Sequence, residues 1–262
     1  MKQNRSSSHN VNADQSGAGS PNSREAWLAE LQAASLLKQK SFMEGIAARL
    51  NRPRIQSKPE QPFRGAPEFW NSFQWTTEEQ LQQFTANFQA AGGQAVHLAT
   101  SAEAANFIVG LAEEMKATRI LMHHQPGLDR LRLAQQLQHA QVSVWNDEVD
   151  INGIEHAARA EIGVIEADHA VAYTGSLVTK SSAHQGRSVS LLPAVLIAII
   201  PVSRLVTRLG EVLAELDSAG REKLPAGIHF ISGPSRSADI ENDLTIGVHG
   251  PGIVYALLVD QW

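Results

Sequence analysis

Two short polar turns in the middle of the chain carry side chains that can bind an anion. Thr174-Gly175-Ser176 interrupts an apolar run that begins at Ala170. The segment His184–Ser188 adds Gly186 and the guanidinium of Arg187. Hydroxyls and guanidinium groups bind carboxylate and phosphate oxygens, and glycine lets the backbone approach a ligand closely. Each turn alone is also explained by ordinary turn formation.

A third polar segment, Ser232–Asp239, follows an apolar run at Ile228–Ile231. It holds Gly233, Ser235 and Arg236, and its pattern predicts a strand, a glycine turn and the start of a helix. Free backbone N–H groups at a helix start bind anions, although an ordinary capped helix shows the same residues. Together the three segments predict a pocket for a small carboxylate or a phosphate.

Four side chains are the predicted acids or bases of this pocket. Glu166 and Asp168 directly precede an apolar run, so at least one of them can face a ligand, unless both are solvated loop charges. Asp239 closes the third segment. His249 lies between glycines in Gly247–Gly252 and is otherwise explained as a hydrogen-bonded turn residue.

The sequence lacks the residues that several other kinds of site would need. The adjacent His123 and His124 point to opposite faces of a strand, so no metal site is predicted. The chain has no cysteine, which excludes thiolate ligation of metals or iron-sulfur clusters by this chain. A formal net charge of −5 disfavours nucleic-acid binding. The N-terminus lacks the apolar core of a secretory signal and no apolar run could span a bilayer, so a cytoplasmic protein is expected.

The elements that must position these residues alternate between strands and helices. Val195–Ile200 is wholly apolar and lies between Pro193 and Pro201, which is typical of a strand buried on both faces of a parallel sheet. Three strand-helix units precede it. The predicted fold is therefore α/β, with a parallel-rich sheet flanked by helices and an N-terminal helical extension.

The predicted domains follow changes in composition. Residues 1–23 are polar and are expected to be disordered, and residues 24–75 read as one or two helices followed by an extended connector. Residues 76–262 form the α/β domain, opened by a capping box at Thr76 and Glu79.

The polar segments resemble those of a known family. Glu166–Ser176, Gln185-Gly186-Arg187 with Ser190–Pro193, and Ile231–Glu241 with Gly247–Pro251 are similar to the LUD-domain family of lactate utilization protein C. The likeness covers roughly residues 42–260. It implies a fold like that of the NagB/RpiA/CoA-transferase superfamily.

The resemblance also implies a part in oxidising L-lactate to pyruvate, with partner proteins that carry the iron-sulfur clusters. The family usually has an acidic residue where this chain has Tyr173, and a tyrosine stays neutral near pH 7. Glu166, Asp168 and Asp239 are then the remaining acids. Two alternatives stay open: a stand-alone isomerase or transferase acting on a phosphorylated or CoA-linked substrate, and a non-catalytic ligand sensor or scaffold.

Overall fold

The computed structural model describes residues 21–54, 56–57, 73–146, 153–238 and 244–262. The chain divides into two compact units, Met1–Pro67 and Glu68–Trp262. The described residues of the first unit contain one continuous helix, α1 (Pro21–Arg49), where the sequence left one or two helices open. The sequence had placed the end of this helical region near Arg52 and Pro53. Asp239 belongs to the residues outside the described ranges.

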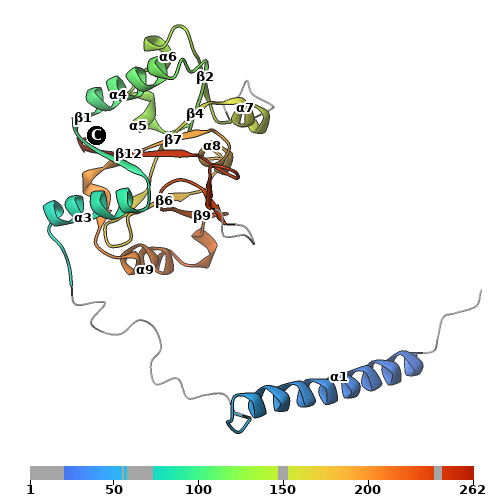
Figure 1. Cartoon of the computed structure of the whole chain (residues 1–262). Helices are drawn as coiled ribbons and strands as arrows, with labels where there is room; N and C mark the ends of the chain where they lie inside the picture. The colour runs from blue at the N-terminus through green and yellow to red at the C-terminus, as the bar shows by residue number, and fades with distance from the viewer. Residues whose placement is uncertain (1–20, 55, 58–72, 147–152, 239–243) are drawn as a thin grey trace, which may run out of the picture. The chain divides into compact units, whose positions relative to one another are not determined.

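The second unit is built on a parallel sheet (Figure 1). Among the described residues the sheet has six strands, in the order β1 (Gln94–Thr100), β12 (Ile253–Gln261), β7 (Val195–Pro201), β4 (Ile162–Glu166), β2 (Arg119–Met122) and β3 (Gln141–Val144). Every neighbouring pair is parallel. The predicted α/β fold with an N-terminal helix is confirmed.

The central strand β7 explains how both faces are covered. All of its residues are buried, as its apolar run predicted. Because successive side chains on a strand point to opposite faces, Val195, Ile197 and Ile199 join one apolar cluster. Leu196, Ala198 and Ile200 join the other. The sheet is therefore the middle layer of two cores.

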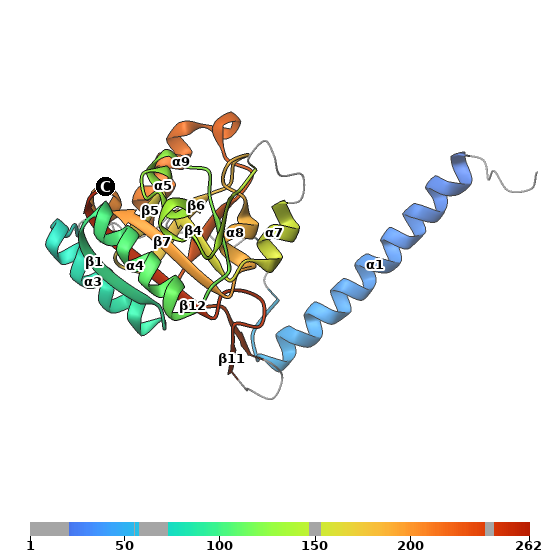
Figure 2. The same ribbon diagram turned by 90° about the horizontal axis from the view of Figure 1, so that it is seen from above.

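Helices on one face of the parallel sheet are α4 (Ser101–Glu114), α5 (Pro126–Asp129) and α6 (Leu133–Gln136) (Figures 1 and 2). The opposite face packs against α3 (Thr77–Ala90), α7 (Gly153–Arg159) and α8 (Arg187–Leu191), and against a second sheet. The order of that sheet is β8 (Leu205–Val206), β5 (His169–Val171), β6 (Ser176–Lys180) and β9 (Ile228–Ile231).

The outer face of the second sheet is covered by α9 (Leu209–Ala219), whose Val212 and Leu216 pack with Val171 and Val178. Short 3-10 turns lie at η1 (Val202–Arg204) and η2 (Arg221–Lys223). A separate antiparallel pair joins β10 (Arg236–Ala238) to β11 (Leu244–Ile246). Within the described residues, no helix combines the length and the hydropathy needed to cross a bilayer.

Three predicted helices differ from the structure. The sequence predicts one helix from about Leu128 to His139, but the structure has the two short helices α5 and α6, because Arg132 between them has a left-handed backbone with φ of 49°. Ser203 and the apolar residues after it predict a helix capped by this serine. In the structure the helix, α9, begins at Leu209, where the Glu211 carboxylate accepts the Arg208 N–H at 2.8 Å.

The third difference concerns Ser232–Asp239. Its described part is a turn followed by strand β10, and no helix starts there. Arg236 pairs with Ile246, and the Ser235 N–H donates to the Pro251 carbonyl at 2.9 Å. A helix start would have left backbone N–H groups free to bind an anion. In the structure some of these groups form hydrogen bonds within the chain instead.

Candidate functional site

A cleft of about 800 Å³ lies where four strands of the parallel sheet end. It is lined by His124, Gln125, Pro126, Gly127 and Arg130 after β2, by Glu166 at the end of β4, by Arg204 after β7, by Trp262 after β12, and by Asp168, His169, Lys180, Ser182, His184, Gln185 and Glu215. The carboxyl ends of parallel strands are where α/β proteins bind ligands, because strand-to-helix loops converge there. We refer to this feature as the cleft.

Glu166 is the most buried acid of the cleft, with 7% of its side chain exposed. Its carboxylate lies 2.8 Å from the Arg204 guanidinium, and its backbone N–H and carbonyl both pair with the Gln125 amide at 3.1 Å. A side chain at Gly127 would overlap the carboxylate, so only glycine leaves room for it there. The carboxylate is thus held in one place from three directions.

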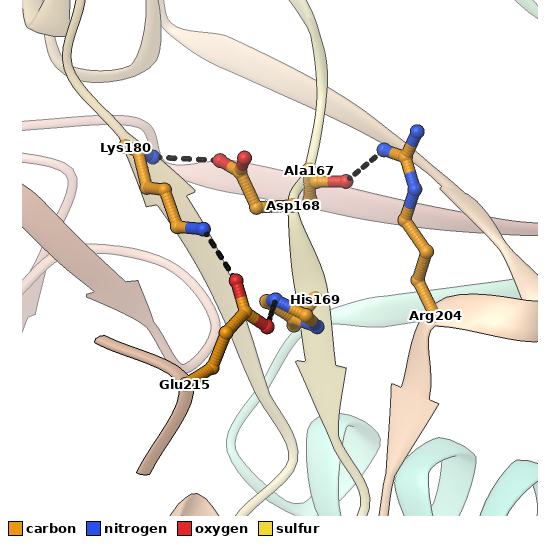
Figure 3. A network of polar contacts seen from close by, with 6 residues as sticks. All are labelled: Ala167, Asp168, His169, Lys180, Arg204 and Glu215. Carbon is orange, nitrogen blue, oxygen red and sulfur yellow. Dashed lines mark hydrogen bonds and ion pairs between the residues drawn. The ribbon is translucent and has the colours of Figure 1, made fainter. Parts of the chain in front are cut away.

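Arg204 reaches a second acceptor, the Ala167 carbonyl at 3.0 Å (Figure 3). Its guanidinium therefore bridges Glu166 and the residue after it in the chain. Because the end of β7 and the end of β4 are neighbours in the sheet, this bridge fixes one wall of the cleft.

Asp168, His169, Lys180 and Glu215 form a connected network on the opposite wall (Figure 3). The Lys180 backbone N–H donates to Asp168 at 2.8 Å, and its ammonium lies 3.1 Å from Glu215. His169 Nε2 lies 3.0 Å from the other oxygen of Glu215. The hydrogen bond from Lys180, and more weakly the charge of His169, lower the pKa of Glu215. Its carboxylate is therefore held ionised and joins α9 to strands β5 and β6.

Besides His169, three histidines lie at or behind the cleft. His123 is buried with Nε2 3.1 Å from the Gly186 carbonyl, and burial lowers its pKa to about 4. His124 turns to the other side and meets the His184 ring edge-on at 4.9 Å between centroids. In the described part of the chain, no three side chains of the metal-binding types gather into a group that could hold an ion.

Several polar groups at the cleft have no hydrogen-bond partner among the described residues. The Arg130 guanidinium forms no ion pair there, whereas Arg204 and Lys180 are each matched by a carboxylate. Trp262 Nε1 is buried and also lacks an acceptor. Guanidinium groups bind carboxylates through paired hydrogen bonds, so Arg130 is the cation available to an anionic ligand.

The structure separates the residues predicted from the sequence. Glu166 and Asp168 line the cleft, as do His184 and Gln185. The Thr174–Ser176 turn lies at the far end of the β5–β6 hairpin from Asp168. There the Ser176 hydroxyl lies 2.7 Å from that of Ser232, and Gly175, with φ of 57°, packs against the backbone of α3.

The other predicted turn residues lie near that far end or along α8. Gly233 packs against the Ala91 carbonyl, to which Arg236 also donates a hydrogen bond. Gly186 is the N-cap residue of α8 and packs on Trp145. Burial is the main cause that lowers the pKa of His229, and the positive charge of Arg187 is the second cause. Ligand binding by these residues stays a prediction.

His249 and Tyr173 both lie outside the cleft lining. His249 is exposed in the glycine turn that packs beside Ser235. Tyr173 is 44% exposed and its ring lies 5.6 Å from Phe73 and 6.2 Å from Trp75, measured between centroids. It therefore neither replaces a cleft acid nor fills the core.

Several residues of the cleft were not predicted from the sequence: His124 as a ligand contact, Arg130, Lys180, Arg204, Glu215 and Trp262. The positions of His124 and Arg204, just beyond buried strands, were a usable signal, because strand ends meet at one edge of the sheet. Glu215 lies on a helix far along the chain, and no local pattern marks it.

Comparison with known proteins decides the family. The LUD domain matches residues 81–259 of the chain. This chain belongs to the LUD domain family. Among similar proteins, "Lactate utilization protein C" of Shouchella clausii is 34% identical over 84% of this chain and 97% of its own length. "Lactate utilization protein C" of Halalkalibacterium halodurans is 45% identical, over 55% of this chain and 64% of its own length.

The LUD domain also has a solved relative. A DUF162 family protein from Deinococcus radiodurans is 19% identical, with a TM-score of 0.52 over 71% of this chain and 99% of its own. At that identity the likeness supports the fold alone. "Uncharacterized protein YkgG" of Escherichia coli is 29% identical over 84% of this chain and 97% of its own length.

Proposed function

We propose that this LUD domain protein is a subunit of a system that oxidises L-lactate to pyruvate, and that its cleft binds a small carboxylate. The observation that carries the proposal is the similarity along 97% of a relative named "Lactate utilization protein C". The cleft adds a physical reason, because it combines an available cation with several groups that accept protons.

Arg130 is the residue we assign to the carboxylate. Arg204 and Lys180 are already matched by Glu166 and Glu215, so a bound anion would compete with those pairs. Arg130 has no such competitor among the described residues. A carboxylate at Arg130 would bring a small hydroxy acid into the cleft that Glu166, His124 and His184 also line.

Conversion of L-lactate to pyruvate removes two electrons and two protons. Glu166, Asp168, His124 and His184 are the lining groups able to take the hydroxyl proton. The chain has no cysteine, so thiolate-bound iron-sulfur clusters that accept the electrons would belong to partner proteins. In a variant of this proposal, the protein has an accessory role and does not bind lactate. The experiments below distinguish this variant from a lactate-binding role.

Titration calorimetry of the purified protein with L-lactate tests the carboxylate site. We expect saturable binding that weakens at least about tenfold in Arg130→Gln, since a charge-assisted hydrogen bond contributes roughly 1.5–3 kcal/mol. Arg221→Gln, which removes an exposed arginine at η2, should bind like the wild type. Equal binding by both variants would contradict the site.

Complementation tests the function itself. A strain that lacks this protein should fail to grow on L-lactate and should recover with the wild-type chain. Growth restored by Arg130→Gln without measurable lactate binding would assign the accessory role. Undiminished growth of the deletion strain on lactate would overturn the proposal.

A further inference from the structure

A second cavity, of about 230 Å³, lies beside the cleft. Its polar lining consists of Ser101 and Asn106 from the first half of α4, Arg130 and Arg132 from the α5–α6 turn, and Gln136 of α6. It too lies at the carboxyl edge of the parallel sheet, since β1 ends at Thr100 immediately before α4. Helices α4, α5 and α6 lie together on this face (Figure 1). We refer to it as the second cavity.

The charge of the second cavity differs from that of the cleft. Two guanidinium groups line it, and its described lining residues include no carboxylate. Within the described ranges, neither Arg130 nor Arg132 takes part in an ion pair. Two unmatched guanidiniums beside a serine hydroxyl and two side-chain amides suit a dianionic tetrahedral group, because arginine presents paired donors to phosphate oxygens.

The backbone at Arg132 has an uncommon conformation, which Lys116 also adopts with a φ of 54°. The φ of 49° at Arg132 lies in the left-handed region that glycine and asparagine adopt most easily. An arginine there costs stability and gives nothing to the core, since its side chain is exposed. Placing a guanidinium at the rim of the second cavity is a use that would explain the residue.

The two cavities are neighbours, since Arg130 lines both. The cleft of about 800 Å³ also has room for more than lactate, since pockets of roughly 300–1,000 Å³ hold drug-sized ligands. We propose that the second cavity binds the phosphate group of an organic molecule whose remainder enters the cleft. This inference goes beyond lactate utilization and does not depend on it.

The probe is inorganic phosphate, titrated into the full chain by calorimetry. We expect saturable binding to the wild type that is at least about tenfold weaker in Arg132→Asn, with Arg132→Lys retaining part of the affinity through its charge. Arg132→Asn fits the left-handed backbone, so the variant should fold as stably as the wild type. Arg221→Gln controls for the loss of one positive charge.

The outcomes are separable from those for lactate. Arg132→Asn should leave L-lactate affinity unchanged, because Arg132 lines the second cavity and not the cleft. Phosphate binding that is equal in the wild type and Arg132→Asn would overturn the inference, as would the absence of saturable phosphate binding. Loss of lactate binding in Arg130→Gln with intact phosphate binding would place the phosphate away from the shared arginine and would also overturn it.

Discussion

At the scale of single residues, Gly127 controls the position of the buried acid. A Cβ at this position would overlap Glu166 Oε2 and lie 2.8 Å from Trp262 Nε1. We predict that Gly127→Ala pushes the carboxylate away from Arg204 and destabilises the fold by about 1–3 kcal/mol, as overpacking does. Urea unfolding measures this change.

Gly110→Ala is the matched control, because nothing lies within 4 Å of a Cβ at Gly110 in the middle of α4. That substitution should stabilise the protein by roughly 0.5–1 kcal/mol, the usual helix preference for alanine over glycine. A Gly127→Ala variant as stable as the wild type would show that the Glu166 side chain can take another position at no cost in stability.

His123 makes stability depend on pH. Its pKa falls from 6.5 in the unfolded chain to about 4 in the fold because burial disfavours the charged ring. Above pH 6.5 both states are neutral and the full stability is present. As the pH falls from 6.5 toward 4, the unfolded state takes up the proton first, so stability is lost progressively, by at most about 3 kcal/mol.

His123→Gln should flatten this decline between pH 6.5 and 4, because an amide can still donate to the Gly186 carbonyl but does not titrate. Denaturant unfolding at a series of pH values gives the slopes of the wild type and the variant. An unchanged slope in His123→Gln would assign the acid sensitivity to other groups.

The cleft residues that could be predicted from the sequence are those next to recognisable strands. Glu166 and Asp168 could be placed at a ligand because an apolar run followed them. Arg130, Glu215 and Trp262 come from three distant parts of the chain, and only the folded sheet brings them to one cleft. Conversely, the glycine turns were equally polar but meet one another at the far end of the β5–β6 hairpin.

At the scale of elements, Thr207 joins α3 to the second sheet. It is fully buried, and its hydroxyl accepts from the Trp75 N–H at 3.1 Å and from the Gln80 amide at 3.0 Å. Thr207→Val keeps the shape but leaves two donors unpaired, so we predict a loss of about 1–3 kcal/mol per unsatisfied donor. Thr207→Ser retains the hydroxyl and should cost clearly less in thermal unfolding. Equal losses in the two variants would mean that packing of the methyl group contributes as much as the hydrogen bonds.

The elements predicted well were those marked by local chemistry. The Thr76–Glu79 capping box is present, with the Thr76 N–H donating to the Glu79 carboxylate at 2.8 Å. The burial of β7 could be predicted because no polar residue interrupts its apolar run. The short strands β8 and β10 depend on partners elsewhere in the chain, Ala170 and Val171 for β8 and Leu244–Ile246 for β10, so local patterns favoured helices there.

At the scale of the whole molecule, the parallel topology explains why two cavities adjoin. Strands β1, β2, β4, β7 and β12 run in one direction, so the residues that follow them gather at a single edge. The second sheet and α9 then add Lys180 and Glu215 from one side. The helices α4 to α6 add Ser101, Arg130 and Arg132 from the other.

The same organisation predicts that the second unit folds independently. Its three apolar clusters are made of residues from Trp75 onward, and the LUD domain match begins at residue 81. A chain shortened to residues 68–262 should therefore unfold in one cooperative transition and bind inorganic phosphate with the affinity of the full chain. Urea unfolding and calorimetry measure both properties. Because every residue of the cleft and of the second cavity lies within this unit, a folded fragment with weakened phosphate binding would mean that Met1–Pro67 contributes to the ligand site.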